Sequence, residues 1–296
     1  MVILRTFREA VQDSEFTITA ELTIKREFGK ADVLAQAESL RTSVDAIQVT
    51  DNPYAWVQMS AVAAAGLLID MGIDPVAIMS CRDRNRIALQ SDLLGLRAMG
   101  ASSVLLMRGH QVPKDHILPA RTVFDISARK LIAMARDLDE DETVGPGEAF
   151  FIGTNARVFK PSHDWRAKSL TARARAGAQF LQTQLCFNMD TLRAYMERLV
   201  NLKVTWNYSM MISLAALPSA KTARWLKDNL GFSLIPEAVI KRLEHSKDPE
   251  REGIRICAEL LREVADIPGV SGAHLMTMGN PEAISAVIMA SGLKRG

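Results

Sequence analysis

The sequence has few cysteines and no apolar run long enough to cross a membrane. Its three cysteines, Cys81, Cys186 and Cys257, lie far apart and form no Cys-x-x-Cys pair, so we expect neither a disulfide framework nor a zinc site. The longest apolar run, 61–69, is too short to span a bilayer. The first 15 residues lack the apolar core and the cleavage site of a secretion signal. These absences predict a soluble, cytoplasmic protein.

The chain also lacks an excess of charge of either sign. It has 36 Lys and Arg against 34 Asp and Glu, a net charge of +2, which argues against a nucleic-acid-binding protein. Its five histidines follow no metal-ligand spacing, so we predict no metal site. Neither a G-x-G-x-x-G segment nor a P-loop occurs. A doubly wound open sheet usually carries such a turn after its first strand, so that fold is the less favoured alternative.

What the sequence does contain is a regular alternation of strand and helix patterns. Runs rich in β-branched residues alternate with segments in which apolar residues recur every three or four positions. This alternation predicts one (β/α)₈ barrel, a single domain over 1–296, with an extra helical segment at about 234–266. We expect strands at 16–23, 45–50, 75–80, 102–107, 149–153, 180–187, 204–213 and 273–278. We expect helices at 31–40, 59–71, 86–99, 126–136, 165–176, 189–200, 220–229, 236–243, 252–264 and 281–289.

The stretch 74–109 contains two apolar strands that each end in a dense group of polar residues. Residues 81–85 follow the first of these strands, and 108–110 follow the second. The carboxyl ends of barrel strands form the mouth where such folds place their chemistry. Polar residues at the predicted strand ends are therefore the site candidates: Glu21, Thr50, Asn52, Ser80, Arg82, Asp83, Arg84, Arg108, Gly109, His110, Thr154, Gln182, Gln184 and Tyr208.

Two of these candidates could transfer protons. Glu21 lies in an apolar, threonine-rich strand, where burial would raise its pKa and suit it to act as a general acid. An ion pair with Lys25 or with an arginine across the mouth is an equally good interpretation. His110 could exchange a proton near neutral pH, although a lone histidine is more often structural. Gly109 before it permits close approach of a ligand to the backbone.

Two further groups of candidates suit ligand binding. Arg82 and Arg84 could hold an anion with their forked donors. The favoured alternative is that they pair with neighbouring carboxylates, while Asp83 or Asn85 caps the next helix. Strand alternation places Gln182 and Gln184 on one face, where their amides could read the donors and acceptors of a heterocycle. These glutamines could instead bond to a neighbouring strand.

Taken together, these motifs resemble the methylenetetrahydrofolate reductase family, and its acetogen-like branch in particular. The resemblance covers nearly the whole chain, and its most specific parts are the segment Arg82–Asn85 and the Ala-Gly-Ala segment that leads to Gln184. The matching segments are TAELTIKRE around Glu21, VDAIQVTDNP at 44–53, 72–95, VLLMRG at 104–109, VFDIS at 123–127, AGAQFLQTQLCFN at 176–188 and FSLIPEAVIKRLE at 232–244.

The resemblance implies a (β/α)₈ flavoprotein that uses FAD to pass a hydride from NADH or NADPH to 5,10-methylenetetrahydrofolate, giving 5-methyltetrahydrofolate. Glu21 matches the family's proton donor, and Gln184 matches the glutamine that binds the pterin. With His110, Glu21 makes up the predicted catalytic pair. Gln184, Gln182 and Tyr208 are the predicted substrate-binding residues. The predicted cofactor-binding residues are Thr50, Asn52, Ser80, Arg82, Asp83, Arg84, Arg108, Gly109, Thr154 and Arg173.

This chain departs from the family pattern at three places. His110 stands where the family has an aspartate, Arg173 stands where it has a lysine, and the loop 153–162 differs. A neutral or cationic imidazole in place of an anion would favour an anionic reduced flavin or a differently charged ligand. The alternatives are therefore a flavin-independent tetrahydrofolate enzyme of methyl transfer or demethylation, or a non-catalytic folate-binding subunit. The resemblance also implies self-association into a homo-oligomer.

Overall fold

Eight parallel strands close into a barrel in the order of the chain, with β8 paired to β1. The computed structural model describes residues 5–13, 15–113, 116, 120–145, 147–230 and 233–293. The predicted (β/α)₈ barrel is therefore confirmed. Its strands are β1 (Thr17–Leu22), β2 (Ala46–Val49), β3 (Pro75–Ser80), β4 (Ser103–Met107), β5 (Phe151–Ala156), β6 (Phe180–Thr183), β7 (Ser209–Ala215) and β8 (Gly272–Met276).

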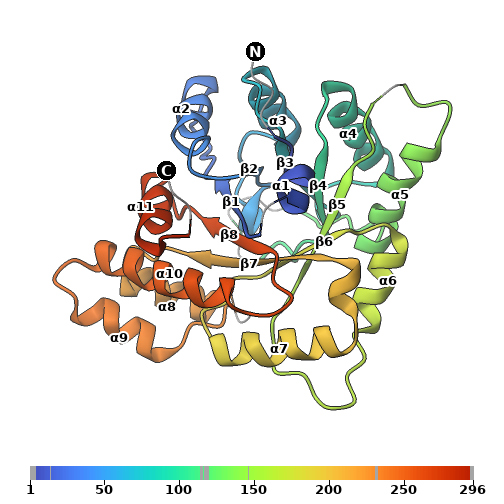
Figure 1. Ribbon diagram of the computed structural model, residues 1–296. Coiled ribbons are helices and arrows are strands. Elements are labelled where there is room, and N and C mark those ends of the chain that lie inside the picture. Colours follow the sequence, from blue (N-terminus) through green and yellow to red (C-terminus); the bar gives the residue numbers. More distant parts are fainter. Residues whose placement is uncertain are drawn as a thin grey trace.

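Helices surround the ring of strands (Figure 1). Within the described ranges, no helix is long and apolar enough to cross a membrane. Two single-turn 3₁₀ helices are η1 (Pro53–Ala55) and η2 (Val204–Asn207). The α-helices are α1 (Phe7–Asp13), α2 (Lys30–Leu40), α3 (Ala61–Asp70), α4 (Arg86–Met99), α5 (Ala128–Glu140), α6 (Lys168–Ala176), α7 (Met189–Asn201), α8 (Ala220–Asn229), α9 (Glu237–His245), α10 (Pro249–Ala265) and α11 (Glu282–Ser291).

Strand alternation divides the core into two layers. On β3, Ala77 and Met79 pack between the barrel and its helices, whereas Val76 and Ile78 fill the barrel interior. The same alternation on the other strands sends every second residue inward. The inner apolar cluster consists of Phe7, Ala46, Val76, Ile78, Leu105, Phe151, Phe180 and Met211.

The short helix α1, which the sequence did not predict, closes the amino-terminal end of the barrel. Figure 1 shows it over the middle of the ring of strands. Phe7 on α1 is fully buried, and its ring centroid lies 5.6 Å from that of Phe151 and 5.1 Å from that of Phe180. Because aromatic rings fill this end, the opposite end is the one that remains open to a ligand.

Two predicted strand boundaries are wrong in ways that affect the site. The predicted strand 180–187 pairs within the barrel only as far as Thr183, although the Gln184 amide still donates to the Ala156 carbonyl at 2.8 Å. The predicted strand 204–213 begins only at Ser209, because Lys203 has a positive φ of 56° and 204–207 forms η2. Tyr208 therefore precedes β7 and does not lie within it.

Candidate functional site

Glu21 at the end of β1 lies beside a buried histidine from β8. Glu21 Oε2 is 3.7 Å from His274 Nε2, and the exposed fractions of the two side chains are 15% and 2%. His274 Nδ1 in turn lies 3.0 Å from Thr19 Oγ1. Burial and the Glu21 charge together raise the pKa of Tyr54 to about 12. The partner of Glu21 is thus His274, and within the part of the chain that the structure describes Lys25 makes no ion pair with it.

Arg82, which follows β3, forms an ion pair with the adjacent residue Asp83. Its Nε and Nη2 donate to the two carboxylate oxygens of Asp83, both at 2.6 Å, and Nη2 also donates to the Asn52 carbonyl at 2.9 Å. Asn52 Nδ2 donates to Asp83 at 3.5 Å. This group joins the loops after β2 and β3. The interpretation as internal pairing is confirmed for Arg82.

Arg84 is paired in the same way, with two carboxylates. It forms ion pairs with Asp51 and, at 3.0 Å, with Asp92 on α4. Asp51 also accepts the Ser80 amide at 2.8 Å, which fixes the end of β3. The cap of α4 is Asn85, whose side chain accepts the amide of Ala88. The segment 82–85 therefore builds the rim of the mouth from paired charges.

Gly109 lets the end of β4 approach the end of β3 closely. Its φ is +79°, and a Cβ placed there would lie 3.1 Å from Arg82 Cβ and 3.2 Å from Ser80 Cβ. Ser80 is buried, and its hydroxyl has no hydrogen-bond partner among residues 15–113 or elsewhere in the described chain. Gly109 therefore permits close packing of the two strand ends, and the Ser80 hydroxyl beside it keeps an unused hydrogen-bonding capacity. Thr50, by contrast, already bonds to Gln58.

His110 stands in a positively charged surrounding. Burial, followed by the charges of Arg82, Arg108 and Arg157, lowers the pKa of its imidazole below the ordinary value of 6.5. The Arg108 guanidinium lies 3.9 Å from the centroid of the Phe124 ring, a cation–π contact that orients it. At neutral pH the group at this position is therefore a neutral imidazole between guanidinium ions.

Two glutamines follow the interior face of β6, as predicted. Leu181 and Leu185 pack in the layer between barrel and helices, so Gln182 and Gln184 face the interior. Gln182 accepts a hydrogen bond of 2.6 Å from Gln48 Nε2 on β2. The buried Gln184 Oε1 has no partner within the described residues. Gln184 thus keeps a hydrogen-bond acceptor that no described residue uses.

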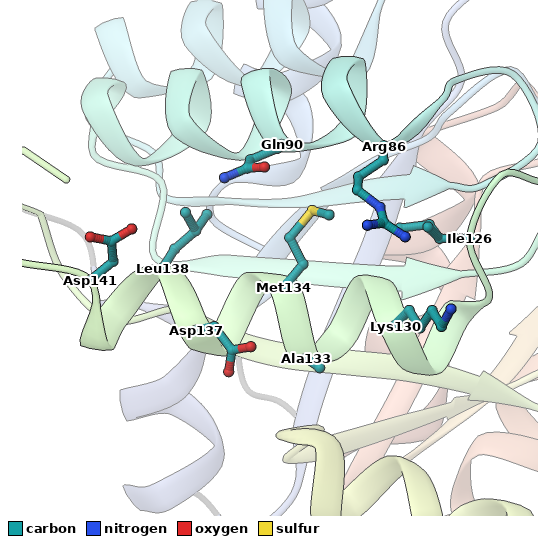
Figure 2. Close-up of a pocket in the computed structure, with 9 residues that line it drawn as sticks. All are labelled: Arg86, Gln90, Ile126, Lys130, Ala133, Met134, Asp137, Leu138 and Asp141. Atoms are coloured by element: carbon teal, nitrogen blue, oxygen red, sulfur yellow. The ribbon is translucent and has the colours of Figure 1, made fainter. Parts of the chain in front are cut away.

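The structure has one cavity at the rim of the barrel and another between two helices. One of about 390 Å³ lies at the rim, among the loops that follow β1 and β2. It is lined by Ile24, Lys25, Arg26, Glu27, Pro53, Trp56, Val57, Gln58 and His116. The other, of about 480 Å³, lies outside the barrel between α4 and α5, where Arg86, Gln90, Lys130 and Met134 line it (Figure 2). No predicted site residue lines either cavity.

Comparison with known proteins identifies the family. The family described as methylenetetrahydrofolate reductase matches residues 6–292. This chain belongs to the methylenetetrahydrofolate reductase family. It is 24% identical over 252 residues to a probable methylenetetrahydrofolate reductase (NADPH) of Caenorhabditis elegans, with 80% of this chain and 35% of that protein covered. The chain therefore spans about a third of the length of that relative.

A solved structure has the same fold. It is an uncharacterized protein from Clostridium thermocellum that binds two copies of 5-methyl-5,6,7,8-tetrahydrofolic acid. The TM-score is 0.60 at 14% sequence identity, and the match covers 97% of this chain and 98% of that one. At this identity the likeness shows the shared barrel.

Two residues predicted at strand ends, Thr154 and Tyr208, do not line the mouth of this reductase-family barrel. Thr154 shares the outer face of β5 with Ile152 and Ala156, and it accepts a hydrogen bond of 3.1 Å from Arg173 of α6. Tyr208 donates to the Leu170 carbonyl at 2.7 Å, and burial raises its pKa to about 12. The predicted placement of Thr154 and Tyr208 at the mouth is wrong, because Thr154 faces outward on β5 and Tyr208 precedes β7. Arg173 lies on α6, within the helix expected at 165–176, and its role in cofactor binding stays a prediction.

Sequence reasoning missed two interior residues of this reductase-family barrel, Gln48 and His274. Both occupy inward positions, since their neighbours Ile47, Val49, Ala273 and Leu275 pack in the outer layer. A polar residue at an inward position of an apolar strand was the available signal.

Proposed function

We propose that this protein is a folate-dependent oxidoreductase that interconverts 5,10-methylenetetrahydrofolate and 5-methyltetrahydrofolate with FAD and NADH or NADPH. Family membership supports this function, as does the folate bound by the Clostridium thermocellum protein. The observation that carries the proposal is the juxtaposition in one mouth of an acid and an unpaired amide. Glu21 is held against His274 there, and Gln184 has a buried oxygen free for a ligand.

Each of these residues has a defined task in this reaction. Gln184 binds the donor edge of the pterin and fixes the ring over the mouth. Protonated Glu21 gives its proton to N10 of the substrate while the bond from N10 to the methylene carbon breaks, which leaves an iminium at N5. His274 then faces the carboxylate that Glu21 has become. Proton transfer at a positioned carboxyl typically contributes about 10²–10⁴-fold to a rate.

The residues at the ends of β3 and β4 fit a flavin. The unpaired Ser80 hydroxyl, the exposed Arg108 guanidinium and the side-chain-free Gly109 would hold its ring and its ribityl chain. Bound FAD would supply the hydride transfer between the nicotinamide and the substrate carbon. Arg82 and Arg84 contribute by holding the rim, since their charges are already neutralised by carboxylates.

The proposal is tested by the visible absorption spectrum of the purified protein and by oxidation of NADH or NADPH with methylenetetrahydrofolate. We expect a yellow protein whose turnover falls at least 100-fold in the variant Glu21→Gln, with the Kd for 5-methyltetrahydrofolate within a few-fold of wild type. The matched control is Glu197→Gln, an exposed carboxylate on the outer helix α7, which should keep full turnover. Unchanged turnover in Glu21→Gln would contradict the role of Glu21.

A second candidate function is flavin-independent folate chemistry, such as methyl transfer to or from tetrahydrofolate. It is favoured by His110 and the three arginines that surround it, where the resembled family has an aspartate. This function predicts a colourless protein that binds 5-methyltetrahydrofolate. The variant His110→Asp would then gain affinity for added FAD, measured by absorbance and flavin fluorescence. A yellow wild-type protein would exclude this alternative.

A further inference from the structure

A pair of glutamines spans the barrel interior beneath the mouth. Gln48 lies on β2 and Gln182 on β6, and these strands are four positions apart in a closed ring of eight, so they face each other across the barrel. Gln48 Nε2 donates to Gln182 Oε1 at 2.6 Å. Gln48 is fully buried, and Gln182 is 8% exposed. We refer to this hydrogen-bonded pair as the amide crossbar.

The amide crossbar marks the floor of the site. Towards the amino-terminal end of the barrel lies the apolar cluster around Phe7, Phe151 and Phe180. At the level of the crossbar, Gln48 is the register partner of Glu21, and Gln48 Nε2 also lies 3.4 Å from Thr19 Oγ1. A ligand that reaches Glu21 therefore rests on the crossbar.

The crossbar leaves one buried acceptor unused. A closed pair of amides makes two hydrogen bonds, but the crossbar makes one, and Gln48 Oε1 has no partner among the residues that the structure describes. Since Gln182 uses its oxygen in that bond, its amide group keeps hydrogen atoms to donate. The crossbar therefore offers an acceptor from Gln48 and a donor from Gln182.

Stability does not explain why an amide pair occupies this position. Replacing both partners of a buried hydrogen bond by apolar groups of the same shape is nearly neutral or stabilising, whereas an unsatisfied buried oxygen costs folding free energy. The surrounding interior positions include Val76, Ile78 and Leu105, so an apolar floor would continue the cluster below it. A ligand that bonds to the crossbar accounts for both the amides and the unused oxygen.

We propose that Gln48, together with Gln182, determines ligand specificity by reading the ring edge of the heterocycle bound in the mouth. An acceptor and a donor together complement a cyclic amide, in which a ring N–H adjoins a ring carbonyl. This inference rests on the proposed function, because the reduced pterin of a tetrahydrofolate carries such an edge. It assigns to Gln48 direct contact with the ligand.

The test is the affinity for 5-methyltetrahydrofolate in Gln48→Met, Gln182→Met and the double variant, measured by titration calorimetry. We expect each single variant to bind at least 10-fold more weakly, as loss of a partner to a buried polar group predicts. The compound p-aminobenzoylglutamate shares the tail of the folate but lacks the ring. Its affinity, measured by competition, should be the same in the variants as in the wild type. The double variant replaces both polar side chains by apolar ones of similar volume, so we expect it to fold. If a single variant does not fold, the affinity of the double variant tests the proposal.

The matched control is Gln36→Met. Gln36 also holds its neighbours through its amide, since it bonds the backbone of Thr23, but it lies on α2 outside the barrel. It should bind 5-methyltetrahydrofolate as wild type does. Wild-type affinity in the crossbar variants would overturn this inference and leave the proposed function standing. A wild-type protein that binds no reduced folate would overturn both.

Discussion

Among individual residues, Gly109 has the clearest structural requirement. Its φ of +79° disfavours any side chain, and a Cβ would press on Ser80 and Arg82. We expect Gly109→Ala to lower the free energy of unfolding by about 1–3 kcal/mol, measured by urea denaturation. The control is Gly145→Ala, where a Cβ would meet no atom within 4 Å and the change should be within about 0.5 kcal/mol. Equal effects in the two variants would contradict this account of Gly109.

The second prediction at this level concerns the titration of His110. Burial and three arginines lower its folded-state pKa below 6.5, so between the two values the unfolded chain binds more protons. The contribution of His110 to stability is therefore complete above about pH 6.5 and is lost as the pH falls through the folded pKa. NMR titration of the imidazole should give a pKa below 6.5, and Arg157→Gln should raise it. A wild-type value at or above 6.5 would contradict the prediction.

The residues of the candidate site were easier to predict from the sequence than the residues that they contact. Glu21 and Gln184 were identified from their strands, and the pair of Arg82 with Asp83 joins adjacent residues. Asp51, a partner of Arg84, instead comes from the loop after β2, 33 positions away. The histidine beside Glu21 comes from β8, whose contact with β1 joins positions 255 apart. No local pattern encodes that distance, because only closure of the barrel brings the first and last strands together.

Helices and strands with local stop signals could be predicted to the residue. The helix α4 has the bounds expected, since Asn85 caps its start and Gly100, with a φ of +93°, ends it. The predicted bounds are wrong where tertiary contacts determine the start or the end of an element. The helix α1 has only seven residues and is held by the packing of Phe7 into the barrel. The segment after Thr183 stays extended but leaves the barrel ladder, since Cys186 pairs with Leu234.

Two helical glycines should respond to alanine with opposite signs. Gly253 on α10 packs so closely on the loop after β7 that a Cβ would lie 2.0 Å from the Leu217 carbonyl oxygen. We expect Gly253→Ala to destabilise the protein by about 1–3 kcal/mol, because the helix must move away. Gly95 on α4 has its nearest neighbour at 3.9 Å, so Gly95→Ala should stabilise it by up to about 1 kcal/mol. Chemical denaturation of both variants measures the change in the free energy of unfolding. A change of the same sign in both variants would contradict this prediction.

In the barrel as a whole, the two ends of the interior differ in the side chains that strand alternation turns inward. Near α1 the barrel interior is filled by aromatic rings such as Phe151 and Phe180, whereas polar side chains such as Glu21 and Gln182 face inward near the carboxyl ends of the strands. The sequence predicted this architecture because each strand and helix carries its own periodic signal. It could not predict the amide crossbar, which requires that two opposite strands be set at matching heights.

Binding at one end of this closed barrel should stabilise all of it, since each strand is paired on both sides. At 100 times its Kd, 5-methyltetrahydrofolate should add about 2.7 kcal/mol to the free energy of unfolding, which raises the Tm by roughly 5 °C. Differential scanning calorimetry of wild type and Glu21→Gln should show the same shift, because Glu21 acts on the proton and not on affinity. The double variant Gln48→Met/Gln182→Met should show a smaller shift at the same ligand concentration. An unchanged Tm at every ligand concentration would contradict folate binding, whatever the colour of the protein.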